Sequence, residues 1–445
     1  MKILFISLGC DKNLADSEEM LGLLTAGGHE ITDDETQADA IVINTCCFIK
    51  DAKEESVETI LEMAEYKKTG SCHALVVTGC MAQRYQKEII EEVPEVDAVL
   101  GTTSYGDIVK ALEEAVAGNH FEEFRDIDYL PDTGSKRVLT TGGHFGYLKI
   151  AEGCDKHCTY CIIPKLRGKF RSVPMERLIA QAEDMAEQGV KELILVAQET
   201  TVYGKDLYGK KSLHILLKKL CEIRGIRWIR ILYCYPEEIY DELIETIRDE
   251  KKICHYLDIP IQHASDHILK RMGRRTSKQE LIDIVGKLRK EIPDIVLRTT
   301  LITGFPGETE EDHEELKEFV DEMEFDRLGV FTYSPEENTP AAEMADQVPE
   351  EVKEERRDEL MELQQEISYD RGQDRIGQEL LVMIEGKVAD ESAYIGRTYG
   401  DAPKVDGYIF VQTGELLMTG DFAKVRVTGA LEHELIGVMS DEYTE

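Results

Sequence analysis

The chain has 445 residues, 42% of them hydrophobic, and its 89 acidic and 52 basic side chains give a formal net charge of −37. That length suits about three domains, and so acidic a surface disfavours nucleic acid and anionic membranes while it favours basic partners. No apolar run reaches the roughly 18 residues that a membrane span needs, and the short run at residues 2–8 predicts a buried strand rather than a signal segment. With eleven cysteines, three of them clustered, we expect metal chemistry in a reducing cytoplasm rather than a disulfide scaffold.

The first part of the chain, residues 1–120, alternates apolar runs with amphipathic stretches. The apolar runs predict strands at residues 2–8, 40–44 and 74–78 and a short one from residue 98. The stretches between them predict helices at residues 14–26, 51–67, 81–92 and up to residue 116. This alternation indicates a parallel sheet with helices on its faces.

Three cysteines of this region follow strand ends. Cys10, Cys46 and Cys80 each come one or two residues after the last residue of a predicted strand. Because ligands bind at the carboxyl edge of an open α/β sheet, we expect these thiols to converge there and to hold a metal cluster. The alternative is chance placement of small buried thiols, since Cys47 and Cys72 show that spare cysteines occur in this region.

Beyond a turn-rich linker at residues 119–146, strand–helix alternation resumes. Strands are predicted at residues 146–151, 193–197, 228–233, 256–259, 296–302 and 327–332. Helices include residues 175–188, 277–290 and one that a capping box of Thr309 and Asp312 opens and that runs to residue 324. Polar or glycine-rich loops follow the strands at residues 198–203, 235–238, 260–264 and 303–308. Six such units indicate a barrel, or part of one, with its site at the carboxyl ends of the strands.

The loop after the first of these strands carries three thiols within eight residues, Cys154, Cys158 and Cys161. Thiolates select iron–sulfur clusters, zinc or copper(I). A structural zinc site usually needs four protein ligands; the next cysteine is Cys221, and His157 cannot easily turn onto a metal that its neighbours hold. The spacing therefore favours a cluster with one open iron, and a zinc site completed by a distant His or Cys is the alternative.

The last part of the chain predicts a charged helix at residues 349–372 and then alternating segments at residues 380–388, 407–411, 422–427 and 434–439. These segments suit a small antiparallel β-barrel. Residues 376–445 hold five basic and thirteen acidic side chains, and we expect Asp401 and Asp406, in a loop of this barrel, to face a partner. The predicted division is therefore residues 1–120, 140–372 and 376–441.

The cysteine triplet, with Tyr160 before its last member, resembles the signature of radical S-adenosylmethionine (SAM) enzymes. The resemblance implies a partial (βα)6 barrel and a 4Fe–4S cluster whose open iron chelates SAM and whose electron cleaves it to a 5′-deoxyadenosyl radical. The protein would hold the cofactor against the substrate and exclude water. The residues that this implies are cluster ligands at Cys154, Cys158 and Cys161, an adenine-packing ring at Tyr160, and cofactor loops at Gln198 and Gly304.

The whole chain resembles the methylthiotransferase family, in which an α/β domain, a radical SAM barrel and a terminal TRAM domain follow in this order. The motifs that carry the resemblance are Leu8-Gly-Cys10-Asp-Lys-Asn13, Asn44-Thr-Cys46, Thr78-Gly-Cys80-Met-Ala-Gln83, Ile259-Pro-Ile-Gln-His263 and Tyr333-Ser-Pro-Glu-Glu-Asn-Thr-Pro340. It implies that Cys10, Cys46 and Cys80 bind an auxiliary 4Fe–4S cluster. Cys47 departs from the usual small residue at its position, so the choice between Cys46 and Cys47 rests on register, which favours Cys46.

Two branches of the family share this plan. Residues 9–13, 167–171 and 394–403 resemble the RimO-type branch, which methylthiolates the β-carbon of an aspartate in the twelfth small-subunit ribosomal protein. This implies two SAM per product, an electron donor such as flavodoxin or ferredoxin, and no acid–base residue. The acidic terminal barrel suits a basic ribosomal protein, whereas tRNA would need a basic face. The alternatives are the branch that modifies an adenosine of tRNA and a non-catalytic iron–sulfur protein that only binds a partner.

Overall fold

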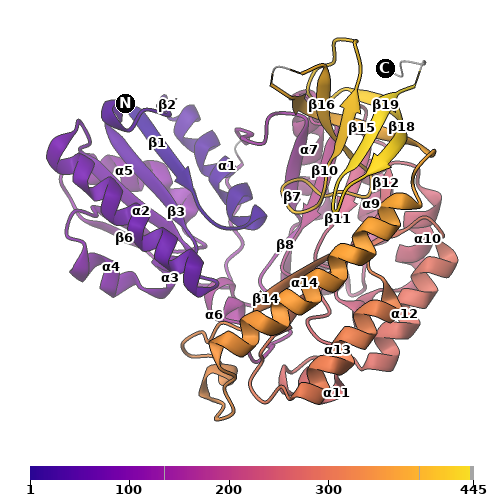
Figure 1. The fold of residues 1–445 in the computed structure, drawn as a ribbon. Coiled ribbons are helices and arrows are strands. Elements are labelled where there is room, and N and C mark those ends of the chain that lie inside the picture. Colours follow the sequence, from indigo (N-terminus) through magenta and orange to yellow (C-terminus); the bar gives the residue numbers. More distant parts are fainter. Residues whose placement is uncertain (135, 390, 441–445) are drawn as a thin grey trace.

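The computed structural model describes residues 1–134, 136–389 and 391–440. It confirms the predicted fold class, except that the terminal barrel, predicted to be antiparallel, contains one parallel pair of strands. Figure 1 shows an N-terminal parallel sheet, a central parallel sheet and a small terminal barrel, in chain order. Among the described residues, no helix is long and apolar enough to cross a membrane.

The N-terminal sheet has six parallel strands in the order β2-β1-β3-β4-β5-β6. Their bounds are β1 (Lys2–Ser7), β2 (Glu30–Thr32), β3 (Ala40–Thr45), β4 (Ala74–Gly79), β5 (Ala98–Leu100) and β6 (Phe121–Glu123). Helices α1 (Asp11–Ala26) and α5 (Ile108–Val116) cover one face. Helices α2 (Lys50–Thr69), α3 (Cys80–Arg84) and α4 (Gln86–Glu92) cover the other. Both faces of β3 and β4 are therefore buried, as parallel sheets require.

Two details of this region differ from the sequence-based expectation. The helix predicted at residues 81–92 is two helices, α3 and α4, which meet at Tyr85. The edge strands β2 and β6 were not predicted, because each has three residues, none of them buried, and lacks the apolar run that marks a strand.

The central sheet has six parallel strands in the order β14-β13-β12-β11-β10-β7. Their bounds are β7 (Phe145–Lys149), β10 (Glu192–Val196), β11 (Trp228–Ile231), β12 (Ile253–Asp258), β13 (Val296–Thr303) and β14 (Arg327–Thr332). A short antiparallel pair, β8 (Ala151–Glu152) and β9 (Arg171–Ser172), stands beside it. The helices of this region are α6 (Ile163–Arg167), α7 (Met175–Glu187), α8 (Lys205–Tyr208), α9 (Leu213–Cys221), α10 (Asp241–Asp249), α11 (Asp266–Arg271), α12 (Lys278–Glu291) and α13 (Glu310–Met323).

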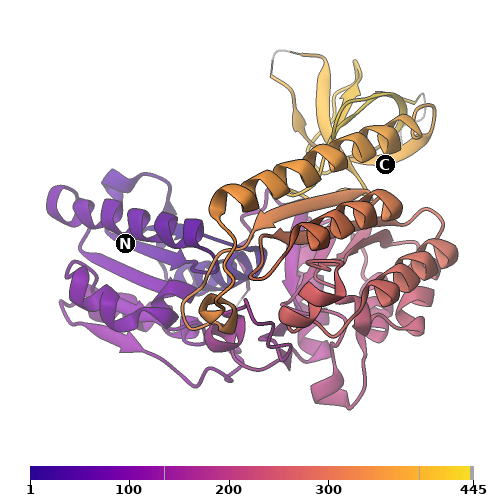
Figure 2. The ribbon, with the colours of Figure 1, turned by 60° about the horizontal axis from the view of Figure 1, so that its bottom comes forward.

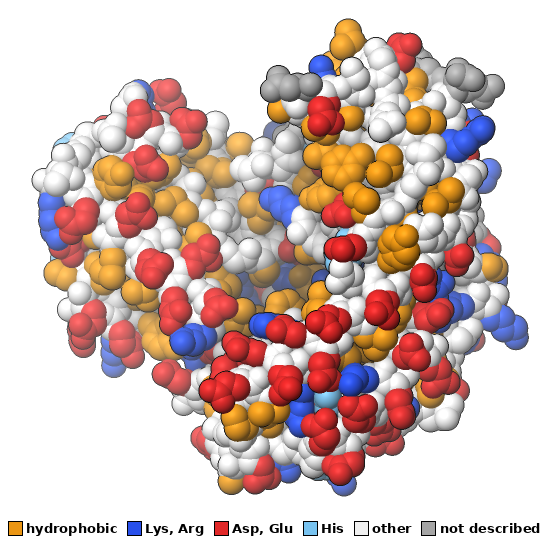
Figure 3. Space-filling view, viewed as in Figure 1, with side chains coloured by type: hydrophobic (Ala, Val, Ile, Leu, Met, Phe, Trp, Pro, Cys, Tyr) orange, Lys and Arg blue, Asp and Glu red, His pale blue; other side chains and the backbone are white. Residues whose placement is uncertain are grey.

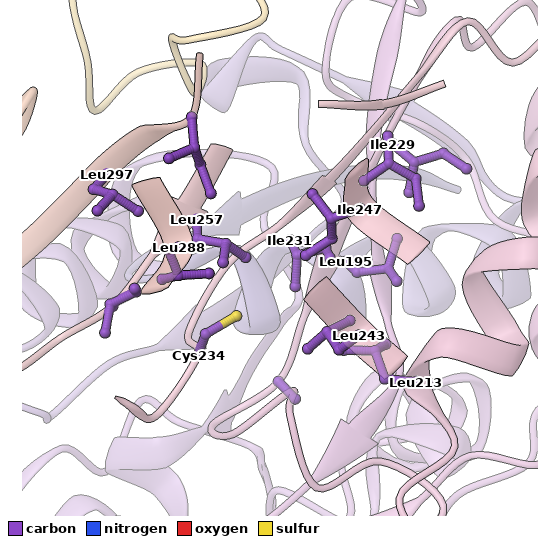
Figure 4. Packing of buried hydrophobic residues seen from close by; sticks show 14 of the residues in the cluster. Leu195, Leu213, Ile229, Ile231, Cys234, Leu243, Ile247, Leu257, Leu288 and Leu297 are labelled. Atoms are coloured by element: carbon purple, nitrogen blue, oxygen red, sulfur yellow. The ribbon is translucent and has the colours of Figure 1, made fainter. Parts of the chain in front are cut away.

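Apolar side chains pack these helices against one face of the central sheet. Figure 4 shows Ile229 and Leu257 of the strands among Leu213, Leu243 and Leu288 of α9, α10 and α12. All five are fully buried. Each such side chain is worth about 1.5–3 kcal/mol relative to exposure, so the outer helices fix the strands whose carboxyl ends carry the loops.

The capping box predicted for the helix before residue 324 is present. The Thr309 side chain accepts from the backbone N–H of Asp312, and the Asp312 carboxylate accepts from the backbone N–H of Thr309 at 3.0 Å. Reciprocal bonding of this kind satisfies two of the free amides at a helix start.

The terminal barrel is closed, in the order β15-β16-β17-β19-β18. Its strands are β15 (Glu379–Lys387), β16 (Ala393–Thr398), β17 (Ile409–Gln412), β18 (Phe422–Ala430) and β19 (Leu435–Met439), and the long helix α14 (Glu350–Gln373) leads to it. In Figure 2, α14 runs along the central domain to this barrel. Strand β16 was not predicted, because Gly396 and Arg397 interrupt its apolar pattern.

The side chain of Arg397, in β16, is buried because it pairs with a buried carboxylate. Glu192 of β10 accepts from Arg397 Nη2 and from Arg230 Nε, each at 2.7 Å, and all three side chains are fully buried. Buried charges persist when they are paired in this way. The terminal barrel is therefore held against the central sheet by ion pairs and by apolar contacts such as that between Trp228 and Phe422.

The expectation that Asp401 and Asp406 face a partner is wrong. Asp401 is 2% exposed and accepts from Arg327, and Asp406 accepts from the Tyr256 hydroxyl at 2.7 Å and lies 3.4 Å from Arg298 Nε. Both carboxylates neutralise arginines of the central sheet, so they belong to the junction between the domains.

Candidate active site at the domain boundary

The carboxyl edges of the two parallel sheets meet at one boundary. Arg84, after β4, donates to Glu336, after β14, at 2.8 Å. The Tyr233 hydroxyl, after β11, donates to Asp11, after β1, at 3.2 Å. In Figure 3 the surface is hollowed between the N-terminal domain and the rest of the molecule. Loops from both sheets therefore surround one space, as the edge argument predicts.

The three N-terminal cysteines stand at neighbouring strand ends. In the sheet register Ser7 lies opposite Asn44, and Thr45 lies opposite Gly79. Cys46 follows β3 directly, Cys80 opens α3 directly after β4, and Cys10 precedes α1. Burial, together with the charges of Cys80 and Cys10, raises the pKa of the Cys46 thiol to about 12. The sheet thus brings these three thiols within electrostatic reach of one another.

Gly9 makes this approach possible. Its φ is +86°, which favours glycine, and a Cβ at this position would lie 2.7 Å from the Cβ of Cys46 and 2.9 Å from its sulfur. Asn13 holds the same turn, because its side-chain amide donates to the Leu8 carbonyl at 2.7 Å. The loop before Cys10 is therefore shaped around Cys46.

Cys46 and Cys47 have different surroundings. The pKa of Cys46 is raised by both Cys80 and Cys10, in addition to burial. Cys47 is fully buried in the core cluster under α2, and its pKa is raised first by burial and then by Cys80; Cys10 is not among the main causes. Together with the close approach of Gly9 to Cys46, this is consistent with Cys46 as the member of the triad.

The central triplet is built on one loop. Gly153, at φ +79°, turns the chain after β8, the Cys154 amide donates to the Gly168 carbonyl at 3.1 Å, and the Cys161 amide donates to the Cys158 carbonyl at 3.0 Å. Burial raises the pKa of Cys154 to about 11, and burial and then Cys158 raise that of Cys161. Hydrogen bonds within the loop, together with one from the Thr159 amide to the Met272 carbonyl at 2.9 Å, fix these three thiols.

Both triads have the donor chemistry of an iron–sulfur site. Across residues 1–134, 136–389 and 391–440, no three Cys, His, Asp or Glu side chains are gathered tightly enough to hold a metal ion as they stand. Each triad nevertheless has a guanidinium beside it: Arg167 Nε donates to Cys80 Sγ at 3.4 Å, and Arg274 Nη1 lies 4.0 Å from Cys158 Sγ. Because metals bind thiolates and cations favour the thiolate, these residues fit a cluster at each triad.

A buried ionic cluster joins the two domains between the triads. Arg167 Nη1 donates to Asp16 at 2.7 Å and to Glu152 at 3.1 Å, and Lys149 donates to Asp16 and, at 2.8 Å, to Glu152. Burial alone would raise the pKa of Glu152, but Lys149 and Arg167 hold it well below its usual range. All four side chains are buried.

The sequence analysis did not find this ionic cluster. A signal was available, because Lys149 and Glu152 stand at the carboxyl end of an otherwise apolar buried strand, where a charge needs a partner. That partner could not be identified from the sequence, because Asp16 lies in another domain.

The three residues expected near the cofactor have different surroundings. Gln198 donates to Glu152 at 2.8 Å, and its side-chain oxygen is buried without a partner. Tyr160 packs edge-on against Phe305, with ring centroids 6.3 Å apart. A Cβ at Gly304 would lie 2.1 Å from Cγ of Lys353 on α14, so the packing of α14 by itself accounts for the glycine there.

A pocket of about 310 Å³ lies beside the triplet and was also not predicted. Cys154, Lys156, Glu199, Glu238 and Arg275 are among its lining residues. Lys156 pairs with Glu238 at 2.6 Å. One carboxylate oxygen of Glu199 is buried without a hydrogen-bond partner, with Lys156 Nζ 4.0 Å away, and burial raises the pKa of Glu199 to about 7.

Comparison with known proteins agrees with this geometry. The radical SAM superfamily matches residues 148–320, the TRAM domain matches residues 376–439, and the uncharacterized protein family UPF0004 matches residues 2–101. The radical SAM methyltransferase TsrM from Kitasatospora setae has a similar fold, with a TM-score of 0.56, 13% identity, and coverage of 76% of this chain and 73% of that one. The fold and the triplet therefore define a radical SAM enzyme.

Sequence relatives narrow this class. The ribosomal protein uS12 methylthiotransferase RimO of Lachnoclostridium phytofermentans is 66% identical over 98% of this chain and 99% of its own length. The RimO proteins of Pelotomaculum thermopropionicum and Clostridium botulinum are 52% and 50% identical, each with at least 98% of both chains covered. The chain belongs to the RimO family of radical SAM methylthiotransferases.

Proposed function

We propose that this chain transfers a methylthio group to the β-carbon of an aspartate in ribosomal protein uS12. The observation that carries the proposal is the meeting of two cysteine triads at one domain boundary, in a chain of the RimO family. One triad lies on each side of that boundary. The division into residues 1–120, 140–372 and 376–441 is part of the proposal.

In this proposal Cys10, Cys46 and Cys80 hold an auxiliary 4Fe–4S cluster, and Cys154, Cys158 and Cys161 hold the cluster that binds SAM. When bound, these groups supply a methylated sulfur and a radical that removes a hydrogen atom from the substrate, with two SAM used per product. Tyr160, Gln198 and Gly304 are assigned to the surroundings of SAM, as the family resemblance implies.

The chain's own residues hold the two halves together and keep water out. The buried cluster of Asp16, Lys149, Glu152 and Arg167 joins α1 to the central domain, and Gln198 is tied to it through Glu152. No proton transfer by a side chain is needed for hydrogen-atom abstraction, so no acid–base pair is assigned.

The partner is a basic protein of the small ribosomal subunit, which implies that the enzyme works where ribosomes are made, in the cytoplasm. With Asp401 and Asp406 buried at the domain junction, the acidic side chains left to meet it on the terminal barrel include Glu415 and Glu432, which are exposed. An electron donor such as flavodoxin or ferredoxin supplies the electron. A tRNA substrate is disfavoured, because it would need a basic face.

The test offers purified uS12 and bulk tRNA separately to the anaerobically reconstituted chain and reads both by mass spectrometry. Methylthio-aspartate in uS12 is the expected product. A modified nucleoside with unmodified uS12 would support the tRNA branch, and SAM left uncleaved with both clusters in place would support a binding protein.

Charge reversal tests the partner. Glu415→Lys together with Glu432→Lys should weaken binding to uS12 several-fold at low salt and less at high salt, because exposed charges are screened within a Debye length of about 8–10 Å. Glu91→Lys, an exposed acid on α4, is the matched control. Stronger binding to tRNA without loss of uS12 binding would count against the proposed partner.

A further inference from the structure

Lys12 places a buried ammonium group between the N-terminal triad and the central sheet. It lies in the first turn of α1, two residues after Cys10, and is 7% exposed. Its Nζ is 3.3 Å from the centroid of the Tyr233 ring, which belongs to the loop after β11. The charge is therefore held at the boundary that both triads face.

The other buried cations show that this position is unusual. Nine Lys and Arg side chains are buried in the described part of the chain, and seven of them have a carboxylate in ion-pair contact. The two exceptions are Lys12 and Arg274. Arg274 has a local role, because it donates to the Pro260 carbonyl at 2.8 Å, covers the Tyr235 ring and lies beside Cys158.

Cys10, Asp11 and Tyr233 stabilise the Lys12 charge electrostatically, but none of them forms an ion pair with it. Asp11, its neighbour in sequence, accepts from the Tyr233 hydroxyl, and no carboxylate of the described residues is in ion-pair contact with Lys12. A cation–π contact is worth about 0.5–2 kcal/mol, whereas burial of an unpaired charge costs several. An anion from outside the chain would supply the missing partner.

We infer that Lys12 binds the side-chain carboxylate of the substrate aspartate and is a specificity-determining residue for that side chain. The inference rests on the proposed function and names the group that selects its substrate. The β-carbon of an aspartate is bonded directly to the carboxylate carbon. An ammonium two residues from Cys10 would therefore hold the reacting carbon beside the N-terminal triad. No bond forms or breaks in this step, in which the carboxylate exchanges water for the ammonium group.

The experiment measures binding without turnover. The full chain, with both clusters reconstituted and no reductant present, is titrated with a uS12 peptide that carries the target aspartate and with the same peptide carrying asparagine. The wild type should prefer the aspartate peptide by about tenfold or more, the range for a hydrogen bond to a charged group. Lys12→Met should reduce this preference to about twofold or less, and Lys12→Arg should keep most of it.

Lys50→Met is the matched control, because Lys50 lies in the same domain but is exposed and pairs with Glu54 on the surface. It should discriminate between the peptides like the wild type. The ratio of the two affinities is measured within one preparation, so partial misfolding of Lys12→Met does not change it. An unchanged preference in Lys12→Met would overturn the inference. A wild type that binds neither peptide would instead count against the proposed function.

Discussion

The two cysteine triads of this chain are built in opposite ways. Cys10, Cys46 and Cys80 come from three strands, and only the register of the N-terminal sheet brings them together. Cys154, Cys158 and Cys161 share one loop, which backbone hydrogen bonds within it and from Thr159 to Met272 hold in place. The first site therefore needs three separate strand ends in register, whereas the second needs one loop in place. Changes far from the N-terminal cysteines should damage their site and spare the triplet.

Removal of the ligands should separate the two sites completely. In Cys154→Ala/Cys158→Ala/Cys161→Ala we expect loss of about half the iron and of all SAM cleavage, because the open iron that binds SAM is gone. The matching triple variant at Cys10, Cys46 and Cys80 should lose the other half and still cleave SAM. Iron and sulfide analysis, with chromatographic detection of 5′-deoxyadenosine, provides the measurement. Full iron content in either variant would contradict the assignment of its triad.

A single methyl group at Gly9 should affect only the N-terminal triad. Gly9→Ala places a Cβ within 2.9 Å of Cys46 at a φ of +86°, so Cys46 must move. We expect loss of the iron held by the N-terminal triad, with SAM cleavage retained. Gly28→Ala is the control, because Gly28 has φ +82° but open space around it, and it should cost only the roughly 1–2 kcal/mol of the left-handed conformation. Equal iron loss in both variants would show that backbone strain, not contact with Cys46, is responsible.

Both cysteine triads could be predicted from the sequence, because each has a sequence signature. The triplet is visible as a spacing, and the three N-terminal cysteines are visible as residues that follow apolar runs. The arrangement of the parallel sheets and the capping box at Thr309 were predictable for the same reason: they follow from local periodicity and from caps.

Contacts between domains could not be predicted in this way. Asp401 and Asp406 look like surface acids in the sequence but neutralise Arg327 and Arg298. Strand β16 was not predicted because the charge of Arg397 interrupts its apolar pattern. In the structure Glu192, from another domain, pairs with that charge. A charge that is satisfied by a distant partner carries no local signal of that partner.

Arg167 bonds to Asp16 in the N-terminal domain and to Glu152 in the central domain. Its removal therefore tests how much this ionic cluster stabilises the contact between the two domains. Arg167→Met should lower the free energy of unfolding of the apoprotein by about 3–5 kcal/mol, because it leaves Asp16 and Glu152 to share Lys149. Denaturant unfolding provides the measurement. Hydrogen exchange should also accelerate in α1, where Asp16 lies.

Arg171→Met is the control for that change. Arg171 donates to two backbone carbonyls and lies 3.6 Å from a partly exposed Asp128, so we expect a cost of about 1 kcal/mol or less. Comparable losses in the two variants would remove the special role of the buried ionic cluster.

The smallest expected effect is a pH dependence of the free energy of unfolding. It arises beside the triplet rather than at the N-terminal triad. Burial raises the pKa of Glu199, beside Cys154, from 4.5 to about 7 in the folded chain. A carboxyl whose folded pKa is raised contributes stability that is fully present below its unfolded pKa and is lost as the pH rises through the folded value. Between pH 5 and pH 8 the apoprotein should therefore lose about 2–3 kcal/mol relative to Glu199→Gln, which cannot ionise.

Denaturant unfolding of both proteins across this range measures the difference. Glu238→Gln is the control from the same pocket. Burial by itself would raise the pKa of Glu238, but bonds from Lys156 and Lys211 lower it. The contribution of Glu238 is therefore lost only as the pH falls below about 4.5, and its variant should follow the wild type between pH 5 and pH 8. If wild type and Glu199→Gln showed parallel pH profiles, Glu199 would be ionised throughout, and the pocket beside the triplet would be more polar than its burial implies.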